Sequence, residues 1–277
     1  ALIAIGYTMV YGILLMINFA HGDIVMMACY FAFFGITVFH IPWYITFVGV
    51  IIATAILGVV IERTAYRPLR DAPKNSVLIS AIGASFLLEN LANYLFSGRP
   101  MRFPNIELLS QNISIGGLQI QAICLVIPVI TIISLVVLLH IVNHTKTGMA
   151  MRAVSKDYEI ARVMGVDIDK ISSITFIIGS SLAAIGAIMW GIRYPGITPM
   201  MVVMPGLKCF IAAVIGGIGN IKGAVLGGFI LGLGEILIVA FFPQLSGYRD
   251  AFAFIVLIVI LFYKPTGLLG EKTTEKV

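Results

Sequence analysis

Residues 143–170 read NHTKTGMAMRAVSKDYEIARVMGVDIDK and form a polar island in a chain that is otherwise apolar. Long apolar runs lie on both sides of this island. It holds charges of both signs, namely Lys146, Arg152, Lys156, Arg162 and Lys170 against Asp157, Glu159, Asp167 and Asp169. A large, charged, helix-forming loop between apolar segments is typical of a membrane protein that presents the loop to a soluble partner.

The composition of the whole chain is that of a protein embedded in lipid. Of its 277 residues, 60% are hydrophobic and 11% are charged, whereas soluble domains carry about 25% charged residues. The alternation of apolar and polar residues that marks a membrane β-barrel is not visible. We therefore predict an all-α, polytopic membrane bundle. The net charge of +5 is no sign of nucleic-acid binding, because the basic residues lie in loops beside the spans.

Nine apolar segments predict about eight to nine spans, since a span needs roughly 20 apolar residues. The segments 24–39 and 206–218 are short for a full crossing, and such segments can be broken or re-entrant helices. The chain opens at Ala1 inside an apolar run, which we interpret as the middle of a span and not as a signal peptide. No linker divides the sequence, so we expect one membrane domain over residues 1–277. The segments are 1–17, 24–39, 43–61, 76–96, 121–142, 171–191, 206–218, 222–242 and 251–263.

Lysine and arginine are distributed unevenly among the loops. The rich segments are 62–75, 143–170 and the tail after Tyr263, with Lys264, Lys272 and Lys276 in the tail. The positive-inside rule places these loops and the C-terminus in the cytoplasm. This orientation is self-consistent if the segment 206–218 crosses the membrane. We prefer that crossing, because a re-entrant segment would turn the tail outward against the charge bias.

Inside the island we expect a short helix over Lys156–Met164. Ser155 is a suitable N-cap, and acidic residues in the first turn suit the helix dipole. Gly165 stands where a residue with positive φ would end the helix. Asp167 or Asp169 would then cap the next helix, which runs into the membrane.

The short helix of the island would carry an apolar face made by Ile160, Val163 and Met164. Such a face is what docking into a groove on a partner protein requires. An amphipathic helix that rests on lipid headgroups has the same pattern. The residues alone do not separate these two interpretations.

Several polar residues interrupt apolar runs and are candidates for a translocation path. A charged residue in the bilayer costs about 2.5–3.5 kcal/mol unless it faces water, a pore or a partner. The four candidates between Asn18 and Asp23 fit both a discontinuous helix on the path and an ordinary interfacial loop. The two glutamates, Glu89 and Glu235, can also be structural, or they can couple transport to protons. The candidates are Asn18, His21, Gly22, Asp23, Glu89 and Glu235.

A glycine-rich stretch begins at Gly216 and ends near Glu235. It lacks the Gly-Lys-Ser/Thr ending of a phosphate-binding loop. Small residues spaced by four let helices approach closely in lipid, so we favour helix packing over a flexible gate. We identify no catalytic site and no metal site, because no nucleophile has a nearby base and the cysteines lie far apart. The glycines are Gly216, Gly217, Gly219, Gly223, Gly227, Gly228 and Gly232.

Five stretches together resemble the inner-membrane permease subunits of ABC importers for branched-chain amino acids, the LivH type. They cover most of the chain in the order found in that family, although the family's N-terminal segment is not seen here. The stretches are ALIAIGYTMVYGILLMINFAHGDI (1–24), IERTAYRPLR (61–70) with LISAIG (78–83), RAVSKDYEIARVMGVDIDKISSITFIIGSSLAAIGA (152–187), AAVIGGIGNIKGAVLGGFILGLGE (212–235) and KPTGLLG (264–270).

The resemblance implies that residues 143–170 form a cytoplasmic coupling loop whose part from residue 153 onward docks on an ATPase. Glu159, Ala161 and Gly165 stand at the positions of the family's EAA–G pattern, with Ile160 in place of its second alanine. The other candidates in this loop are Ala153 and Asp157.

The resemblance also implies a complex in a bacterial inner membrane. Its other members would be a second related permease that forms a heterodimer with this subunit, two cytoplasmic ATPases and an extracytoplasmic substrate-binding protein. ATP and Mg would be bound by the ATPases, with no cofactor and no enzymatic activity in this subunit. Leucine, isoleucine and valine would move inward by alternating access. Amide and urea importers use similar permeases, and an ion-coupled secondary transporter is an alternative of another class.

Overall fold

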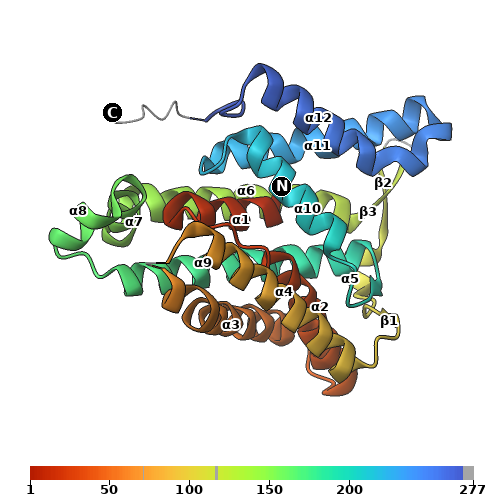
Figure 1. The fold of residues 1–277 in the computed structure, drawn as a ribbon. Coiled ribbons are helices and arrows are strands. Elements are labelled where there is room, and N and C mark those ends of the chain that lie inside the picture. Colours follow the sequence, from red (N-terminus) through yellow and green to blue (C-terminus); the bar gives the residue numbers. More distant parts are fainter. Residues whose placement is uncertain (71, 116–117, 271–277) are drawn as a thin grey trace.

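The computed structural model describes residues 1–70, 72–115 and 118–270, which form a bundle of helices (Figure 1). Within these residues, seven helical segments are long and apolar enough to cross a membrane. Two shorter apolar helices, α1 (Leu2–Leu14) and α10 (Val203–Gly216), accompany them. The predicted all-α, polytopic class is confirmed, and each predicted apolar segment corresponds to one of these elements.

The other α-helices are α2 (His21–Phe33), α3 (Trp43–Ile61), α4 (Lys74–Phe96), α5 (Glu107–Ser110), α6 (Ala122–His144), α7 (Lys146–Lys156), α8 (Tyr158–Val163), α9 (Ile168–Arg193), α11 (Ile221–Phe241) and α12 (Arg249–Tyr263). Two π-helical turns, η1 (Phe34–Val38) and η2 (Glu62–Tyr66), extend α2 and α3. Two 3₁₀ turns are η3 (Arg67–Leu69) and η4 (Pro243–Tyr248). The strands are β1 (Met101–Arg102), β2 (Asn112–Ile115), β3 (Leu118–Gln121) and β4 (Gly196–Ile197).

Helix α9 is the most buried of the long spans and packs against α1, α2 and α3. Small residues bring its neighbours close. A Cβ atom on Gly6 of α1 would lie 2.8 Å from the carbonyl oxygen of Gly179, and one on Gly58 of α3 would lie closer still to the hydroxyl oxygen of Ser180. Without a hydrophobic driving force between helices in lipid, such close packing is a main source of association. The centre of the bundle is therefore built around α9.

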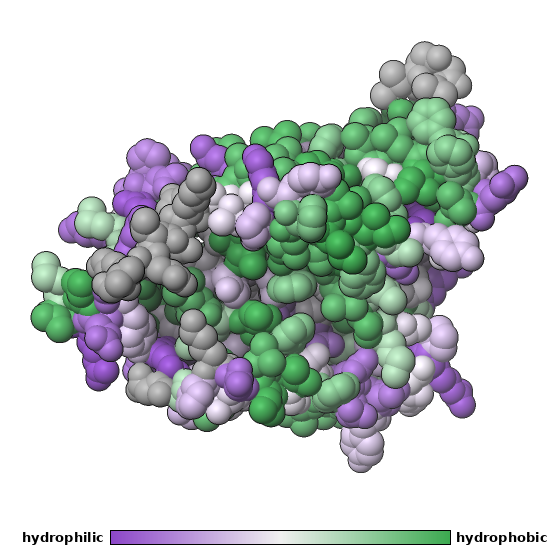
Figure 2. All heavy atoms as spheres, turned by 45° about the horizontal axis from the view of Figure 1, so that its top comes forward, coloured by the Kyte–Doolittle hydropathy of each residue, from purple (hydrophilic) through white to green (hydrophobic). Residues whose placement is uncertain are grey.

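The outer helices present apolar side chains to their surroundings. Helix α12 and its preceding turn are scarcely buried, and α6 and α11 are mostly exposed although they are strongly apolar. Figure 2 shows hydrophobic residues gathered across the middle of one face, with hydrophilic residues toward the two ends. This is the distribution of a protein that is surrounded by lipid at mid-height.

The glycine-rich stretch forms the hairpin between α10 and α11. Gly217 and Gly219 have φ of 104° and 89°, which L-residues with side chains rarely adopt. The segment after α12 closes this hairpin, because the backbone N–H groups of Leu268 and Leu269 donate to the last carbonyls of α10 at 2.8 and 2.9 Å. Asn220 caps α11 by accepting from the N–H of Gly223.

The loop expected over residues 97–120 contains β-structure that the sequence did not predict. Strand β1 pairs antiparallel with β4, and β2 pairs antiparallel with β3. Phe103 is buried beneath this layer against Gly191. The strands lie at the end of the molecule opposite α7 and α8 (Figure 1). The predicted tail lysines Lys272 and Lys276 lie outside the described residues.

Candidate functional site

The polar island folds into two helices, α7 and α8, and not into the single helix over Lys156–Met164 that we predicted. Ser155 is no N-cap, because it lies within α7 and its hydroxyl donates to the carbonyl of Arg152 at 2.9 Å. Thr145 caps α7 by accepting from Gly148 N–H, and Asp157 caps α8 by accepting from Ile160 N–H, both at 3.0 Å. The prediction failed because Thr145 starts a helix ten residues earlier than expected, and aspartate caps as well as serine does.

The end of α8 matches its prediction. Gly165 has φ of 83°. Its N–H donates to Arg162 and the N–H of Val166 donates to Ala161, at 3.1 and 3.0 Å, which is the pair of bonds that defines a Schellman motif. Asp167 then caps α9 by accepting from the N–H of Lys170 at 3.1 Å. The chain therefore turns sharply between α8 and the central helix.

One side of the island is fixed to the bundle. Met151, Val154 and Ala161 are buried and belong to one cluster with residues of α1, α6 and α9, among them Met9 and Leu138. The other predicted coupling residues occupy the outer side: Ala153, Glu159 and Gly165 are exposed, and Asp157 is half-buried.

The tip of α8 carries an apolar patch that nothing in the described chain covers. Ile160, Val163 and Met164 are 58%, 86% and 78% exposed. Figure 1 shows α7 and α8 projecting from one end of the bundle. We call these three residues the α8 tip. A rigidly mounted apolar tip among charged residues is a surface suited to a partner protein.

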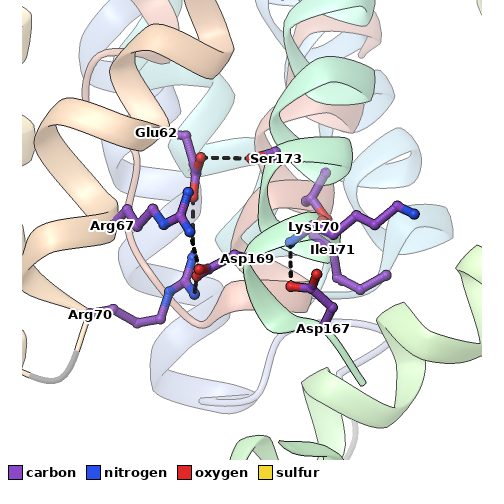
Figure 3. A network of polar contacts seen from close by, with 9 residues as sticks. Glu62, Arg67, Arg70, Asp167, Asp169, Lys170, Ile171 and Ser173 are labelled. Atoms are coloured by element: carbon purple, nitrogen blue, oxygen red, sulfur yellow. Dashed lines mark hydrogen bonds and ion pairs between the residues drawn. The ribbon is translucent and has the colours of Figure 1, made fainter. Parts of the chain in front are cut away.

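A charged network, which we call the anchor, joins the end of α3 to the start of α9 (Figure 3). Glu62 is fully buried, and it accepts from Arg70 at 3.1 Å and from the hydroxyl of Ser173 at 2.9 Å. Arg70 also pairs with Asp169 at 2.5 Å, and Arg67 donates to the same carboxylate. Asp169 follows the cap of α9 by two residues, so the anchor lies directly after the island.

Sequence reasoning missed the anchor. It treated Arg67 and Arg70 only as charges that indicate orientation. These residues lie 102 and 99 positions from Asp169, and a single sequence does not reveal which distant charges meet. The one available signal was Glu62, a carboxylate at the end of an apolar run.

The helices are interrupted at residues 15–20, so Asn18 lies in the break, whereas His21, Gly22 and Asp23 form the first turn of α2. Helix α1 ends at Leu14, and α2 begins at His21. A cavity of about 220 Å³ lies beside this break, lined by residues of α1, α2, α4 and α10. Five of the six path candidates line it together: Asn18, His21, Gly22, Asp23 and Glu89.

Glu235 lies elsewhere and is not part of this cavity. It pairs with Lys208 of α10 at 2.9 Å, and Lys208 also pairs with Asp250 of α12 at 2.7 Å. The sequence offered no partner for Glu235, and this ion triad across three helices provides one. A second cavity of about 700 Å³ touches Glu235, Lys208 and Ala1.

The predicted glycines differ in their surroundings. A Cβ atom on Gly216 or Gly223 would overlap the backbone of the other residue, and one on Gly227 would overlap the carbonyl of Ala212. A Cβ atom on Gly232 would meet nothing within 4 Å. Helices α10 and α11 therefore approach most closely at the glycines nearest the turn that joins them. The other three glycines also face backbone atoms. Gly217 faces Gly270, Gly219 faces Gly12 of α1, and Gly228 faces Ala1.

The fold and these sites define a multi-pass helical membrane protein with a projecting two-helix loop, a charged anchor beneath it and a polar cavity inside. The family described as branched-chain amino acid transport system, permease component, matches residues 1–261, and the chain belongs to this family.

Curated relatives cover the whole chain. It is 39% identical over 291 residues to the high-affinity branched-chain amino acid transport system permease protein LivH of Salmonella typhimurium, an alignment that spans 100% of this chain and 93% of that protein. It is also 39% identical over 290 residues to the corresponding protein BraD of Pseudomonas aeruginosa, with the same coverage. A probable permease, LivM of Methanocaldococcus jannaschii, is 27% identical over 143 residues, 47% of this chain and 41% of that protein. No solved structure gives a significant match.

Proposed function

We propose that this chain is the membrane subunit of an ATP-driven importer for leucine, isoleucine and valine, and that the substrate moves inward by alternating access. The family match and the named relatives support this cargo. The observation that carries the mechanism is the α8 tip, an exposed apolar surface on a helix whose opposite side is buried.

The partner of the α8 tip is, in this proposal, a cytoplasmic ATPase. Each large apolar side chain gains about 1.5–3 kcal/mol when it is fully buried, so a groove that covers Val163 and Met164 would gain a useful part of that energy. The tip residues lie within the segment 159–165, which carries Glu159, Ala161 and Gly165 of the EAA–G pattern. ATP and Mg would be bound by the ATPases, and this subunit would supply no catalytic group.

Through the anchor, a movement of α8 would be transmitted to helices within the membrane. A displacement of the α8 tip would be passed to α9 through the tight turn at Gly165 and the cap at Asp167. At Asp169 the anchor ties α9 to the end of α3. Helices α3 and α9 would therefore move together when the ATPases close.

The remaining assembly follows from the same proposal. A second, related permease completes the path, and the partial match to LivM supports a family in which more than one kind of permease exists. An external binding protein docks on the opposite end of the bundle, where β1–β4 lie, and sets the choice among amino acids. The island, the basic loops and the C-terminus face the cytoplasm.

The test is ATP-dependent uptake of labelled leucine by the complete complex in proteoliposomes. Val163→Glu together with Met164→Glu puts charge on the tip without touching the core, because both side chains are more than three-quarters exposed. We expect loss of uptake and weaker retention of the ATPases on the permease. Phe39→Glu, the same kind of change at a side chain that is 69% exposed beyond η1, should retain uptake.

Other outcomes would replace parts of the proposal. Unchanged uptake in the tip variant would remove the α8 tip from the mechanism. Leucine uptake that follows a proton gradient without ATPases would indicate an ion-coupled transporter. Transport of amides or urea in place of leucine would support the same class of ATP-driven importer with a different substrate.

A further inference from the structure

The cavity beside the break between α1 and α2 is lined by residues whose polar groups the described chain leaves unsatisfied. Tyr7, Asn18 and His21 line it and are 5%, 1% and 2% exposed. Within the described part of the chain, the hydroxyl of Tyr7, Nδ2 of Asn18 and Nδ1 of His21 have no hydrogen-bond partner. A buried polar atom without a partner costs about 1–3 kcal/mol. Three residues that line this one cavity each carry such an atom, which points to a bound polar molecule.

The roles of these atoms follow from the bonds that their side chains do make. Tyr66 donates to Oδ1 of Asn18 at 2.9 Å, so the unsatisfied amide of Asn18 is a donor. Nε2 of His21 lies 3.1 Å from the carbonyl of Ile3, which places the proton of a neutral ring there and leaves Nδ1 as an acceptor.

The same cavity holds two carboxylates. Asp23 is buried and accepts from the hydroxyl of Ser85, and Glu89 of α4 also lines the cavity. A cation bound beside these two carboxylates would balance their negative charge. A metal ion could not also satisfy the donor on Asn18, and an anion would be repelled by the carboxylates. A zwitterion satisfies donors and carboxylates together.

The rest of the cavity wall is apolar. This surface fits the aliphatic part of an amino acid, and a volume of about 220 Å³ is room for roughly seven water molecules at about 30 Å³ each. That is the size of a small metabolite and less than the roughly 300–1,000 Å³ of drug-sized sites. The large apolar residues are Phe19, Ile82, Phe86, Val202, Val203, Leu207 and Phe210.

The cavity opens beside α4. Phe86 lines it and is 59% exposed. Farther along the same helix, Asn90 and Asn93 are also exposed, and α4 is the least apolar of the long spans. Amide side chains that face hydrocarbon are unfavourable. A second permease packed on α4, as the proposed function requires, would cover this opening and shield the amide side chains from lipid.

We propose that this cavity binds the transported amino acid during its passage. The ammonium group lies between Asp23 and Glu89 with Nδ1 of His21 as a further acceptor. The carboxylate accepts from Asn18 and Tyr7, and the aliphatic side chain lies on the apolar wall. This inference rests on the proposed function and adds a recognition site for the zwitterionic head group within the membrane.

The test is protection of a cysteine placed at the cavity rim, in the complete complex held in nanodiscs. Phe86→Cys is made in a background with Cys124→Ser and Cys209→Ser, while the buried Cys29 is retained. Its reaction with a water-soluble methanethiosulfonate reagent is followed with and without L-leucine. We expect slowing by a factor of 1 + [L]/Kd, about tenfold at ten times the Kd. Phe39→Cys, in an exposed loop remote from the cavity, should react at the same rate with and without leucine.

Two analogues and two variants sharpen the result. 4-Methylpentanoate lacks the ammonium group of leucine and 3-methylbutylamine lacks its carboxylate, so neither should protect as leucine does. Asp23→Asn and Glu89→Gln should each weaken the protection by leucine about 10- to 100-fold, the range for loss of a charged hydrogen bond. Equal protection by leucine and 4-methylpentanoate would overturn the proposed recognition of the head group.

Leucine uptake by the same complexes separates this inference from the proposed function. Uptake without protection of Phe86→Cys would overturn the cavity site and leave the importer intact. Protection without uptake would retain the site and overturn the importer. Absence of both would overturn both.

Discussion

Glu62→Gln is expected to be among the most destabilising single changes in the anchor. Glu62 is fully buried and Arg70 is 9% exposed, so removal of the carboxylate leaves a nearly buried guanidinium with only Asp169 to balance it. Breaking a buried pair typically costs 3–5 kcal/mol. Because Arg70 retains Asp169, we expect a loss near the lower end, about 3 kcal/mol. Ser173 also loses a charged acceptor.

The matched control is Arg67→Gln. Arg67 and Asp169 are 42% and 43% exposed, and pairs of that exposure contribute about 0–1 kcal/mol because solvent screens them. The measurement is the free energy of unfolding of the purified protein in detergent micelles, followed by circular dichroism during titration with a denaturing detergent. If Glu62→Gln cost no more than Arg67→Gln, burial would not govern the energy of the anchor. The double variant Glu62→Gln with Arg70→Gln should lose less than the sum of the two single variants.

Three further changes test the island and the hairpin. Asp157→Ala removes the cap of α8 and should cost about 1 kcal/mol, seen as faster amide hydrogen exchange confined to that helix. Gly165→Ala should cost about 1–2 kcal/mol from its left-handed backbone alone, because a Cβ atom there meets nothing within 4 Å; an unchanged unfolding free energy would contradict this. Gly216→Ala should separate α10 from α11 and cost at least 1–3 kcal/mol, whereas Gly232→Ala, which meets open space, should be neutral or stabilising in the same unfolding titration.

Patterns that are local in sequence predicted local structure well. The apolar runs gave the helices, and Gly165 and Asp167 gave the end of α8 and the start of α9, because a turn and a cap depend on neighbouring residues only. The mistaken cap at Ser155 has the same origin, since Thr145, Ser155 and Asp157 all carry side chains that can cap a helix.

Contacts between distant segments could not be predicted. Glu62 and Ser173 lie 111 positions apart, and nothing in their neighbourhoods specifies that α3 and α9 are adjacent. The candidate path residues show the same limit. Polarity within apolar runs singled out six candidates, but only the fold shows that Glu235 lies in an ion triad, apart from the other five.

The polar side chains of α4 affect how this protein enters the membrane during synthesis. A charged residue at the centre of a helix costs about 2.5–3.5 kcal/mol when that helix inserts alone, and α4 carries Glu89 in the least apolar of the long spans. Ser85 of the same helix bonds Asp23 of α2. Contacts with α2 and η2 are therefore expected to help hold α4 in the bilayer, and the ribosome completes both of these elements before α4.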